Sequence, residues 1–263
     1  MSSNDVTDVN LFFTFGTMRH FSHDKITFIR RELTMYKVGV LLSGCGVMDG
    51  SEIHEAVITL LALDKEGIEY LCIAPNKDQS QVINHITNQT VNERRNMLVE
   101  SARIARGNIK DLNTVNPKDF DAIILPGGFG AACNLSTFAN DGTNAQVLPE
   151  VENFLKDAHS LKKPIGAICI APNIIAKIFG KESPQITIGT DKDTAHKLEQ
   201  MGAKHINKNA DEITIDENNL FVTTPAYMLA KGPRELDEGI TKLVKAIIQL
   251  VKRLKKEPVS SNK

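Results

Sequence analysis

Residues 37–42 read Lys-Val-Gly-Val-Leu-Leu and are followed at 43–46 by Ser-Gly-Cys-Gly. The apolar run predicts a buried strand, and a helix is expected to begin after it, near Asp49 or Ser51. A second apolar run occupies residues 68–74. Strand, helix and strand in this order form a βαβ unit. The sequence therefore predicts parallel strands joined by a right-handed crossover.

The predicted first helix has apolar side chains at helical spacing. They recur at positions i, i+3, i+4, i+7 and i+8, which share one face of a helix. We expect this face to pack against the sheet: Ile53, Ala56, Val57, Leu60 and Leu61.

The rest of the chain continues this alternation of strands and helices. Further strands are predicted at 121–125, 165–168 and 186–188, a hairpin from 213–215 and 220–223, and helices at about 97–105, 148–158, from Pro172, and 236–251. This order predicts an α/β fold in three layers, with a mainly parallel sheet and helices on both faces. Functional sites in such sheets gather beyond the carboxyl ends of the strands.

Composition limits the classes of function. The chain has 263 residues and a formal net charge of −1, which argues against binding to nucleic acid or to an anionic membrane surface. No apolar run has the length of a membrane span. The four cysteines include no Cys-x-x-Cys pair, so reduced thiols and a cytoplasmic location are expected.

The sequence divides into one domain and two flanking segments. Residues 36–251 contain no linker and are predicted to form a single domain. Residues 1–35 are interpreted as a mobile extension or as an over-long gene start, since Asp5 and Asp8 argue against a targeting signal. Residues 252–263 form a charged tail that is expected to fray.

Cys169 is the first candidate for chemistry. The stretch 164–172 reads Pro-Ile-Gly-Ala-Ile-Cys-Ile-Ala-Pro, which places the thiol between a strand and a helix that begins at Pro172. Backbone N–H groups and the dipole at such a helix start favour a thiolate, so the pKa of the thiol is expected to fall. The alternative interpretation is an inert, buried cysteine.

A pair of glycines, Gly127 and Gly128, follows the strand at 121–125. Glycines let backbone N–H groups approach a ligand closely, where they can stabilise an oxyanion. A plain turn is the alternative. Residues 128–133 lack the third glycine of a dinucleotide-binding motif, and no phosphate-loop motif occurs.

Glu52 and Glu55 stand three residues apart at the start of the first helix and so lie on about the same side. A carboxyl group near Cys169 could bond to the thiolate and move protons. From the residues alone, a solvated carboxylate at a helix start is the simpler interpretation. No clustered His and Cys spacing predicts a metal site.

A histidine that could activate Cys169 is not evident. Residue 170 is Ile, and the histidines after Cys169 are His196 and His205, neither at an evident strand end. A Cys–His triad of the protease or glutaminase type is therefore poorly supported.

Several longer motifs carry a resemblance. The chain resembles the ThiJ/PfpI branch of the class I glutamine-amidotransferase-like superfamily and, within it, the isoprenoid-biosynthesis glyoxalase (enhancing lycopene biosynthesis) family. The resemblance covers about residues 36–251, in order. Its motifs lie at 43–56, 94–96, 102–107, 126–132, 169–172, 187–191 and 223–228.

This resemblance implies a flavodoxin-like sandwich, a homodimer, no cofactor and a small dicarbonyl substrate. It assigns Cys169 as nucleophile and the backbone N–H groups of Gly128 and Ile170 as oxyanion donors. Glu55 is the matching carboxylate, and Glu52 is the fallback. The implied activity is conversion of glyoxal to glycolate without glutathione.

Further residues are predicted to line the pocket: Cys45, Glu52, Gly127 and Pro172. Cys133 departs from the pattern, because related sequences carry lysine there, and this puts a charge role at that position in doubt.

Two other functions fit the same residues. One is a redox sensor or chaperone-like protein in which Cys169 oxidises to a sulfinic acid stabilised by Glu55. The other is an accessory protein that binds a partner in an isoprenoid pathway.

Overall fold

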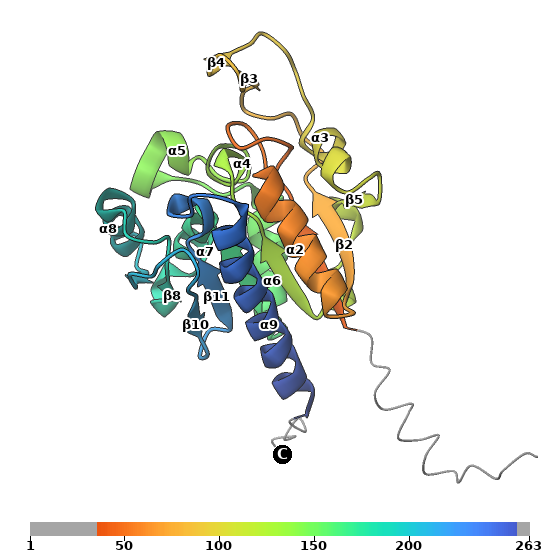
Figure 1. The fold of residues 1–263 in the computed structure, drawn as a ribbon, viewed down its shortest axis with the longest axis vertical. Coiled ribbons are helices and arrows are strands. Elements are labelled where there is room, and N and C mark those ends of the chain that lie inside the picture. Colours follow the sequence, from red (N-terminus) through yellow and green to blue (C-terminus); the bar gives the residue numbers. More distant parts are fainter. Residues whose placement is uncertain (1–35, 257–263) are drawn as a thin grey trace, which may run out of the picture. The chain divides into compact units, whose positions relative to one another are not determined.

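A seven-stranded sheet forms the centre of the molecule in the computed structural model, which describes residues 36–256 (Figure 1). The strand order is β10-β11-β7-β6-β1-β2-β5. All neighbouring strands are parallel except β10 and β11, which pair as an antiparallel hairpin. The strands are β1 (Lys37–Leu41), β2 (Glu69–Ala74), β5 (Ile109–Asp111), β6 (Ala122–Leu125), β7 (Ile165–Ile168), β10 (Thr214–Asp216) and β11 (Phe221–Thr224).

Helices cover both faces of this sheet, as the alternating pattern predicts. On one face α2 (Ile53–Lys65) lies beside α9 (Pro233–Lys256), and their buried side chains share one apolar core (Figure 1). On the other face α6 (Pro149–Ser160) and α7 (Pro172–Phe179) share a second core. The predicted α/β fold with a mainly parallel sheet is therefore confirmed.

Short elements complete the fold. The remaining helices are α3 (Met97–Ile104), α4 (Phe129–Cys133), α5 (Phe138–Asp141) and α8 (Lys192–Gln200), and the 3₁₀ turns are η1 (Leu112–Thr114), η2 (Pro117–Asp119), η3 (Gly142–Asn144), η4 (Gly180–Glu182) and η5 (Ala226–Met228). Two small sheets pair β3 (Ile83–Asn84) with β4 (Gln89–Thr90), and β8 (Gln185–Ile186) with β9 (Lys204–His205).

The predicted boundaries differ from the observed ones at two places. The strand expected at 186–188 is the two-residue β8, which pairs outside the main sheet. Helix α9 continues to Lys256, past the predicted domain end at residue 251. The predicted extension 1–35 and the end of the predicted tail, 257–263, lie outside the described residues.

The buried face of α2 is not the predicted one. Ile53, Val57 and Leu61 are 41%, 46% and 44% exposed. The helix instead turns inward the face that carries Glu55 and small side chains, so the prediction is wrong for these three residues, whereas the predicted Ala56 is buried. Spacing shows which residues share a face but not which face the sheet takes. The buried residues are Glu55, Ala56, Thr59, Ala62 and Leu63.

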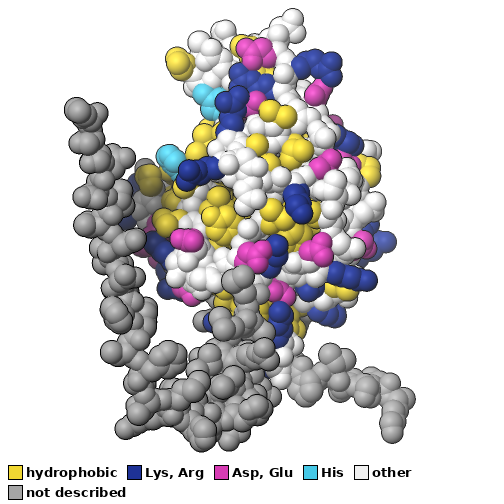
Figure 2. Space-filling model, turned by 90° about the vertical axis from the view of Figure 1, so that its right-hand side faces the viewer, with side chains coloured by type: hydrophobic (Ala, Val, Ile, Leu, Met, Phe, Trp, Pro, Cys, Tyr) yellow, Lys and Arg dark blue, Asp and Glu magenta, His cyan; other side chains and the backbone are white. Residues whose placement is uncertain are grey.

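Apolar surface is exposed on a neighbouring side as well. Figure 2 views the molecule from the side on which α3 and β5 lie in Figure 1, and shows hydrophobic side chains between charged ones. Val99 of α3 is 61% exposed. Within residues 36–256, no helix combines the length and the apolarity that crossing a bilayer requires.

Candidate active site

The candidate site lies where four parallel strands end. The chain leaves β1 toward Glu52 and Glu55, leaves β6 at Gly127, leaves β7 at Cys169 and leaves β11 toward Tyr227. Because the carboxyl ends of parallel strands meet at one edge of a sheet, residues far apart in the sequence come together there.

Cys169 occupies the sharp turn that the sequence predicts. Its backbone is left-handed, with φ of 61°, and its N–H donates to the carbonyl of Thr224 at 2.9 Å. Pro172 opens α7 directly after the turn. A left-handed backbone costs a non-glycine residue about 1–3 kcal/mol, so the surrounding structure must hold it in place.

Glu55 is the carboxyl group that contacts the Cys169 thiol. Its side chain is fully buried and hydrogen-bonds the thiol. Its two oxygens also accept the N–H of Gly127 at 2.8 Å and the N–H of Tyr227 at 3.3 Å. Burial, and then the charge of Glu52, raise the pKa of Glu55 to about 8. Glu55 is therefore equipped to hold and release a proton near neutral pH.

Glu52 has a different position. Its carboxylate accepts the N–H of Glu55 at 2.7 Å and so caps the start of α2. Its backbone N–H donates to the carbonyl of Gly127 at 2.9 Å, which ties the helix start to the glycine turn.

The expectation of a lowered thiol pKa is wrong. Burial raises the pKa of Cys169 well above its usual value, and the ionised Glu55 raises it further. The N–H groups of Gly128 and Ile170 bond to the sulfur and lower the pKa, but these effects are smaller. The sequence shows the helix start, which lowers the pKa of the thiol. It does not show the loss of water around the sulfur, which raises the pKa by more.

Gly127 and Gly128 are required by close contacts. A Cβ added at Gly127 would lie 2.5 Å from the Cβ of Cys169 and 2.6 Å from Oε2 of Glu55. At Gly128, where φ is 92°, a Cβ would lie 2.4 Å from the carbonyl oxygen of Gly50. The turn therefore places the Gly128 N–H on the sulfur with no side chain in the way.

A pocket of about 310 Å³ opens above the thiol. Of the predicted site residues, Cys169, Gly128, Ile170 and Glu52 line it, whereas Glu55, Cys45, Gly127 and Pro172 do not. The Cys45 thiol lies instead near Glu100, Arg103 and Asp49. The complete lining is Val47, Glu52, Gly128, Phe129, Ala132, Phe138, Ala139, Cys169, Ile170, Thr194, Lys197, Tyr227 and Met228.

Sequence reasoning missed Tyr227 and Lys197 as pocket residues. The Tyr227 hydroxyl hydrogen-bonds Nδ1 of His54 at 2.7 Å at the start of α2. Its segment, 223–228, was part of the family resemblance, which is the signal that could have identified it. Lys197 lies in the middle of an ordinary polar helix and carries no such signal.

Neither downstream histidine lines the pocket. Nε2 of His205 accepts the N–H of Ile188 at 3.2 Å, and His196 bonds to Gln200 within α8. Among the described residues, no group of three or more His, Cys, Asp and Glu side chains is arranged to hold a metal ion.

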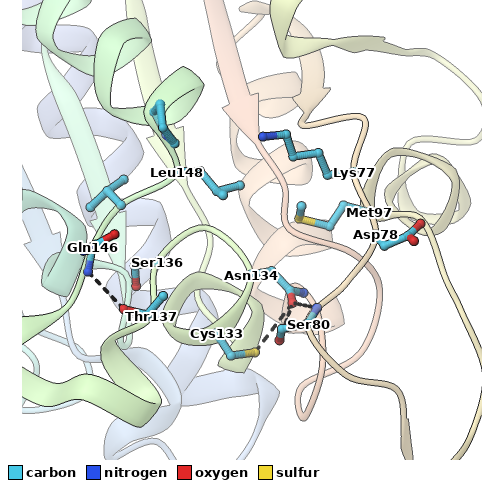
Figure 3. A pocket seen from close by; sticks show the side chains of 12 residues that line it. Lys77, Asp78, Ser80, Met97, Cys133, Asn134, Ser136, Thr137, Gln146 and Leu148 are labelled. Atoms are coloured by element: carbon cyan, nitrogen blue, oxygen red, sulfur yellow. Dashed lines mark hydrogen bonds between the residues drawn. The ribbon is translucent and has the colours of Figure 1, made fainter.

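Figure 3 shows the residues that line a second pocket. This pocket has a volume of about 260 Å³ and shares no lining residue with the first. Cys133 lines it, and its thiol points to Oδ1 of Asn134 at 3.8 Å. The same oxygen accepts the N–H and the hydroxyl of Ser80, at 2.9 and 3.0 Å. Cys133 is therefore part of a structural network of hydrogen bonds.

Comparison with known proteins agrees with the resemblance found in the sequence. Residues 45–245 match the DJ-1/PfpI family model. The chain is 43% identical to the rat ES1 protein homolog, mitochondrial, over 81% of this chain and 84% of the rat protein. It is also 43% identical to the human glutamine amidotransferase-like class 1 domain-containing protein 3, mitochondrial, over 81% and 83%.

Solved structures give a similar result. An isoprenoid biosynthesis protein with an amidotransferase-like domain from Ehrlichia chaffeensis has a TM-score of 0.77 and 36% identity, over 82% of this chain and 99% of that one. Glyoxalase III from Candida albicans, at 16% identity and a TM-score of 0.54 over 82% and 97%, shares the fold.

These relatives correct the predicted location. The rat and human proteins, and a zebrafish ES1 protein that is 33% identical, are all mitochondrial by name. The prediction of a cytoplasmic protein is therefore wrong. It depended on the unpaired cysteines and on the acidic residues near the N-terminus, and a reducing environment is not unique to the cytoplasm.

Proposed function

The chain belongs to the DJ-1/PfpI family, and on this premise we propose that it is a glutathione-independent glyoxalase that converts glyoxal to glycolate. The observation that carries the proposal is the contact between the Cys169 thiol and the fully buried Glu55 carboxyl group. A nucleophile and a proton carrier in contact, beside two backbone donors, are the groups that this isomerisation needs.

In the first half of the reaction, the Glu55 carboxylate takes the proton of the Cys169 thiol, and the resulting thiolate adds to one aldehyde carbon of glyoxal. The S–C bond forms as the carbonyl π electrons move to oxygen, giving an oxyanion. The N–H groups of Gly128 and Ile170, which bond to the sulfur in the free protein, are the donors nearest to that oxyanion. Proton transfer from Glu55 to this oxygen gives a hemithioacetal and restores the Glu55 carboxylate.

In the second half, the Glu55 carboxylate removes the proton from the sulfur-bearing carbon. The resulting enediol takes a proton at the other carbon, which leaves a thioester of glycolic acid. Water hydrolyses the thioester, releasing glycolate and the free thiol. The sum is glyoxal plus water to glycolic acid, with no external oxidant or reductant.

The test is the conversion of glyoxal to glycolate by the wild type and by Cys169→Ala, without glutathione or added metal. We expect turnover in the wild type and none in the folded variant. If the wild type does not turn over while its thiol is reduced, the proposal fails, and oxidation of Cys169 to a sulfinic acid becomes the next function to test.

We also propose that the protein forms a homodimer through α2. Ile53, Val57 and Leu61 form a stripe with i, i+4, i+8 spacing, and all are more than two-fifths exposed. A second copy would remove this apolar stripe from water. Val57→Lys should convert a dimer to a monomer in light scattering, whereas Lys156→Ala on α6, at the other face of the sheet, should not. A wild-type monomer would contradict the proposal.

Two further assignments follow the relatives. We propose that the protein works in mitochondria, which fractionation of cells that express the full chain tests directly. A link with isoprenoid biosynthesis stays a prediction, supported by the description of the similar Ehrlichia chaffeensis protein.

A further inference from the structure

We infer that the preferred substrate is a 2-oxoaldehyde with an anionic group at its far end, and that Lys197 binds this group. The inference rests on the proposed function, because it concerns the substrate of the same pocket. It goes beyond that function by naming a substrate class and a residue that selects it.

The size of the pocket is the first argument. Glyoxal has four non-hydrogen atoms, and its volume is that of two or three water molecules, roughly 60–90 Å³. The pocket measures about 310 Å³, which is in the range of sites that enclose larger ligands. A two-carbon substrate would leave most of this volume to water.

The charges that line the pocket are the second argument. Glu52 lies at the α2 end, beside the buried Glu55 and Cys169. Lys197 of α8 is the one cationic side chain among the described lining residues. The pocket therefore has an acidic end at the thiol and a cationic side chain on α8. An anionic substituent is repelled from the first and attracted to the second, which directs the aldehyde toward the sulfur.

Lys197 is free to take this role. It takes no part in the ion pairs that seven lysines form within residues 36–256. The acid that its charge affects is Asp191, which already accepts the N–H of Thr194 at 2.9 Å as the cap of α8.

The walls between the two ends are apolar. Phe129, Phe138 and Met228 line the pocket, and Phe129 is 54% exposed. An exposed aromatic ring at the rim of a pocket is a typical contact for the carbon skeleton of a ligand. A short carbon chain that joins the dicarbonyl unit to the anionic group fits these walls.

Turnover of three substrates tests the inference: 4,5-dioxopentanoate, its neutral amide, and methylglyoxal. We expect the wild type to prefer the carboxylate over the amide by about three- to fivefold in kcat/KM, the size of an ion pair that stays partly in water. Added salt should reduce this preference. A phosphate-bearing analogue, 3-phosphooxy-2-oxopropanal, shows whether the site favours phosphate over carboxylate.

Lys197→Gln should abolish the preference, bringing the ratio of kcat/KM for the carboxylate to kcat/KM for the amide down to about one. Lys197→Arg should keep it, because the charge is retained. Lys192→Gln, on the same helix but outside the pocket lining, is the matched control and should behave as the wild type. Equal rates for carboxylate and amide in the wild type, or a preference that survives Lys197→Gln, would overturn the inference.

An affinity label separates this inference from the proposed function. In 5-chloro-4-oxopentanoate, the Cys169 sulfur displaces chloride and forms an S–C bond without any turnover. We expect this label to modify Cys169 faster than its neutral amide does, and the difference to vanish in Lys197→Gln. If no dicarbonyl turns over but this difference is present, the glyoxalase proposal fails and the anion site stands. Equal labelling rates would overturn the anion site whatever the turnover.

Discussion

Cys169 and Cys133 are equally buried, each 8% exposed, and each lines a pocket. Their partners differ. Cys169 meets a carboxyl group that titrates, whereas Cys133 points to the amide of Asn134, which does not. The exposed fraction therefore does not distinguish the proposed nucleophile from the structural cysteine in this protein. The group in contact with the sulfur does.

The backbone separates the two cysteines as well. Cys169 has a left-handed backbone between a strand and a helix, whereas Cys133 ends the short helix α4. Asn134 also donates to the carbonyl oxygens of Ser43 and Asp49, at 2.9 and 2.8 Å. Each hydrogen-bonding group of Asn134 is thus committed to holding loops together.

The sharpest test of this comparison is to remove each thiol in turn. Cys169→Ala should reduce glyoxal turnover by at least about 10⁴-fold, because the bond to substrate cannot form. Cys133→Ala should keep the rate within about twofold. Steady-state kinetics on both variants, with circular dichroism as a check of folding, measures whether turnover depends on Cys169 and not on Cys133. Substantial loss in Cys133→Ala would break the comparison.

A second test uses the pH dependence of stability. The pKa of Glu55 is near 4.5 in the unfolded chain and about 8 in the folded protein. Between these values the folded state binds more protons, so the free energy of unfolding falls as pH rises, and it levels off above about 8. The fall attributable to Glu55 is roughly 3–5 kcal/mol. Urea unfolding from pH 4 to 9 should show it in the wild type and not in Glu55→Gln.

Activity of Glu55→Gln gives a third test. We expect kcat/KM to fall by about 10²–10³-fold, since an amide cannot carry the proton. In the wild type the rate should rise with pH through about 8, as the first proton leaves the Glu55–Cys169 pair. The variant should lack this rise, and Glu152→Gln on α6 should retain it. A variant with the wild-type pH profile would remove Glu55 from the mechanism.

The smallest expected effect concerns the second pocket. Asn134→Ala should lower the free energy of unfolding by roughly 2 kcal/mol, because it leaves several buried polar groups without partners. Its kcat/KM should stay near that of the wild type. A large loss of activity without loss of stability would show that the second pocket participates in the reaction.

The alternation of the main strands and helices along the chain was predictable from the sequence. Alternating strands and helices predict parallel strands, and the carboxyl ends of parallel strands meet at one edge of a sheet. Cys169 and Gly128 each follow an apolar run, so the sequence placed both residues at that edge. Local spacing could not choose the inward face of α2, since that choice depends on how Glu55 bonds to the turn after β6.

The pocket walls were less predictable. Phe138, Lys197 and Met228 come from three separate segments, and only the folded chain brings them to one cavity. The thiol pKa was misjudged for a related reason. The helix start is visible in the sequence, but the burial that outweighs it is a property of the packed structure.

The glycine at position 127 has a consequence for how this protein can change over evolutionary time. A single methyl group there would collide with the side chains of Cys169 and Glu55 at once. A substitution at position 127 therefore cannot adjust one of the two side chains without disturbing the other. We expect new substrate preferences to arise on the surrounding walls, at positions such as Lys197 and Phe129, while Cys169 and Glu55 keep their places.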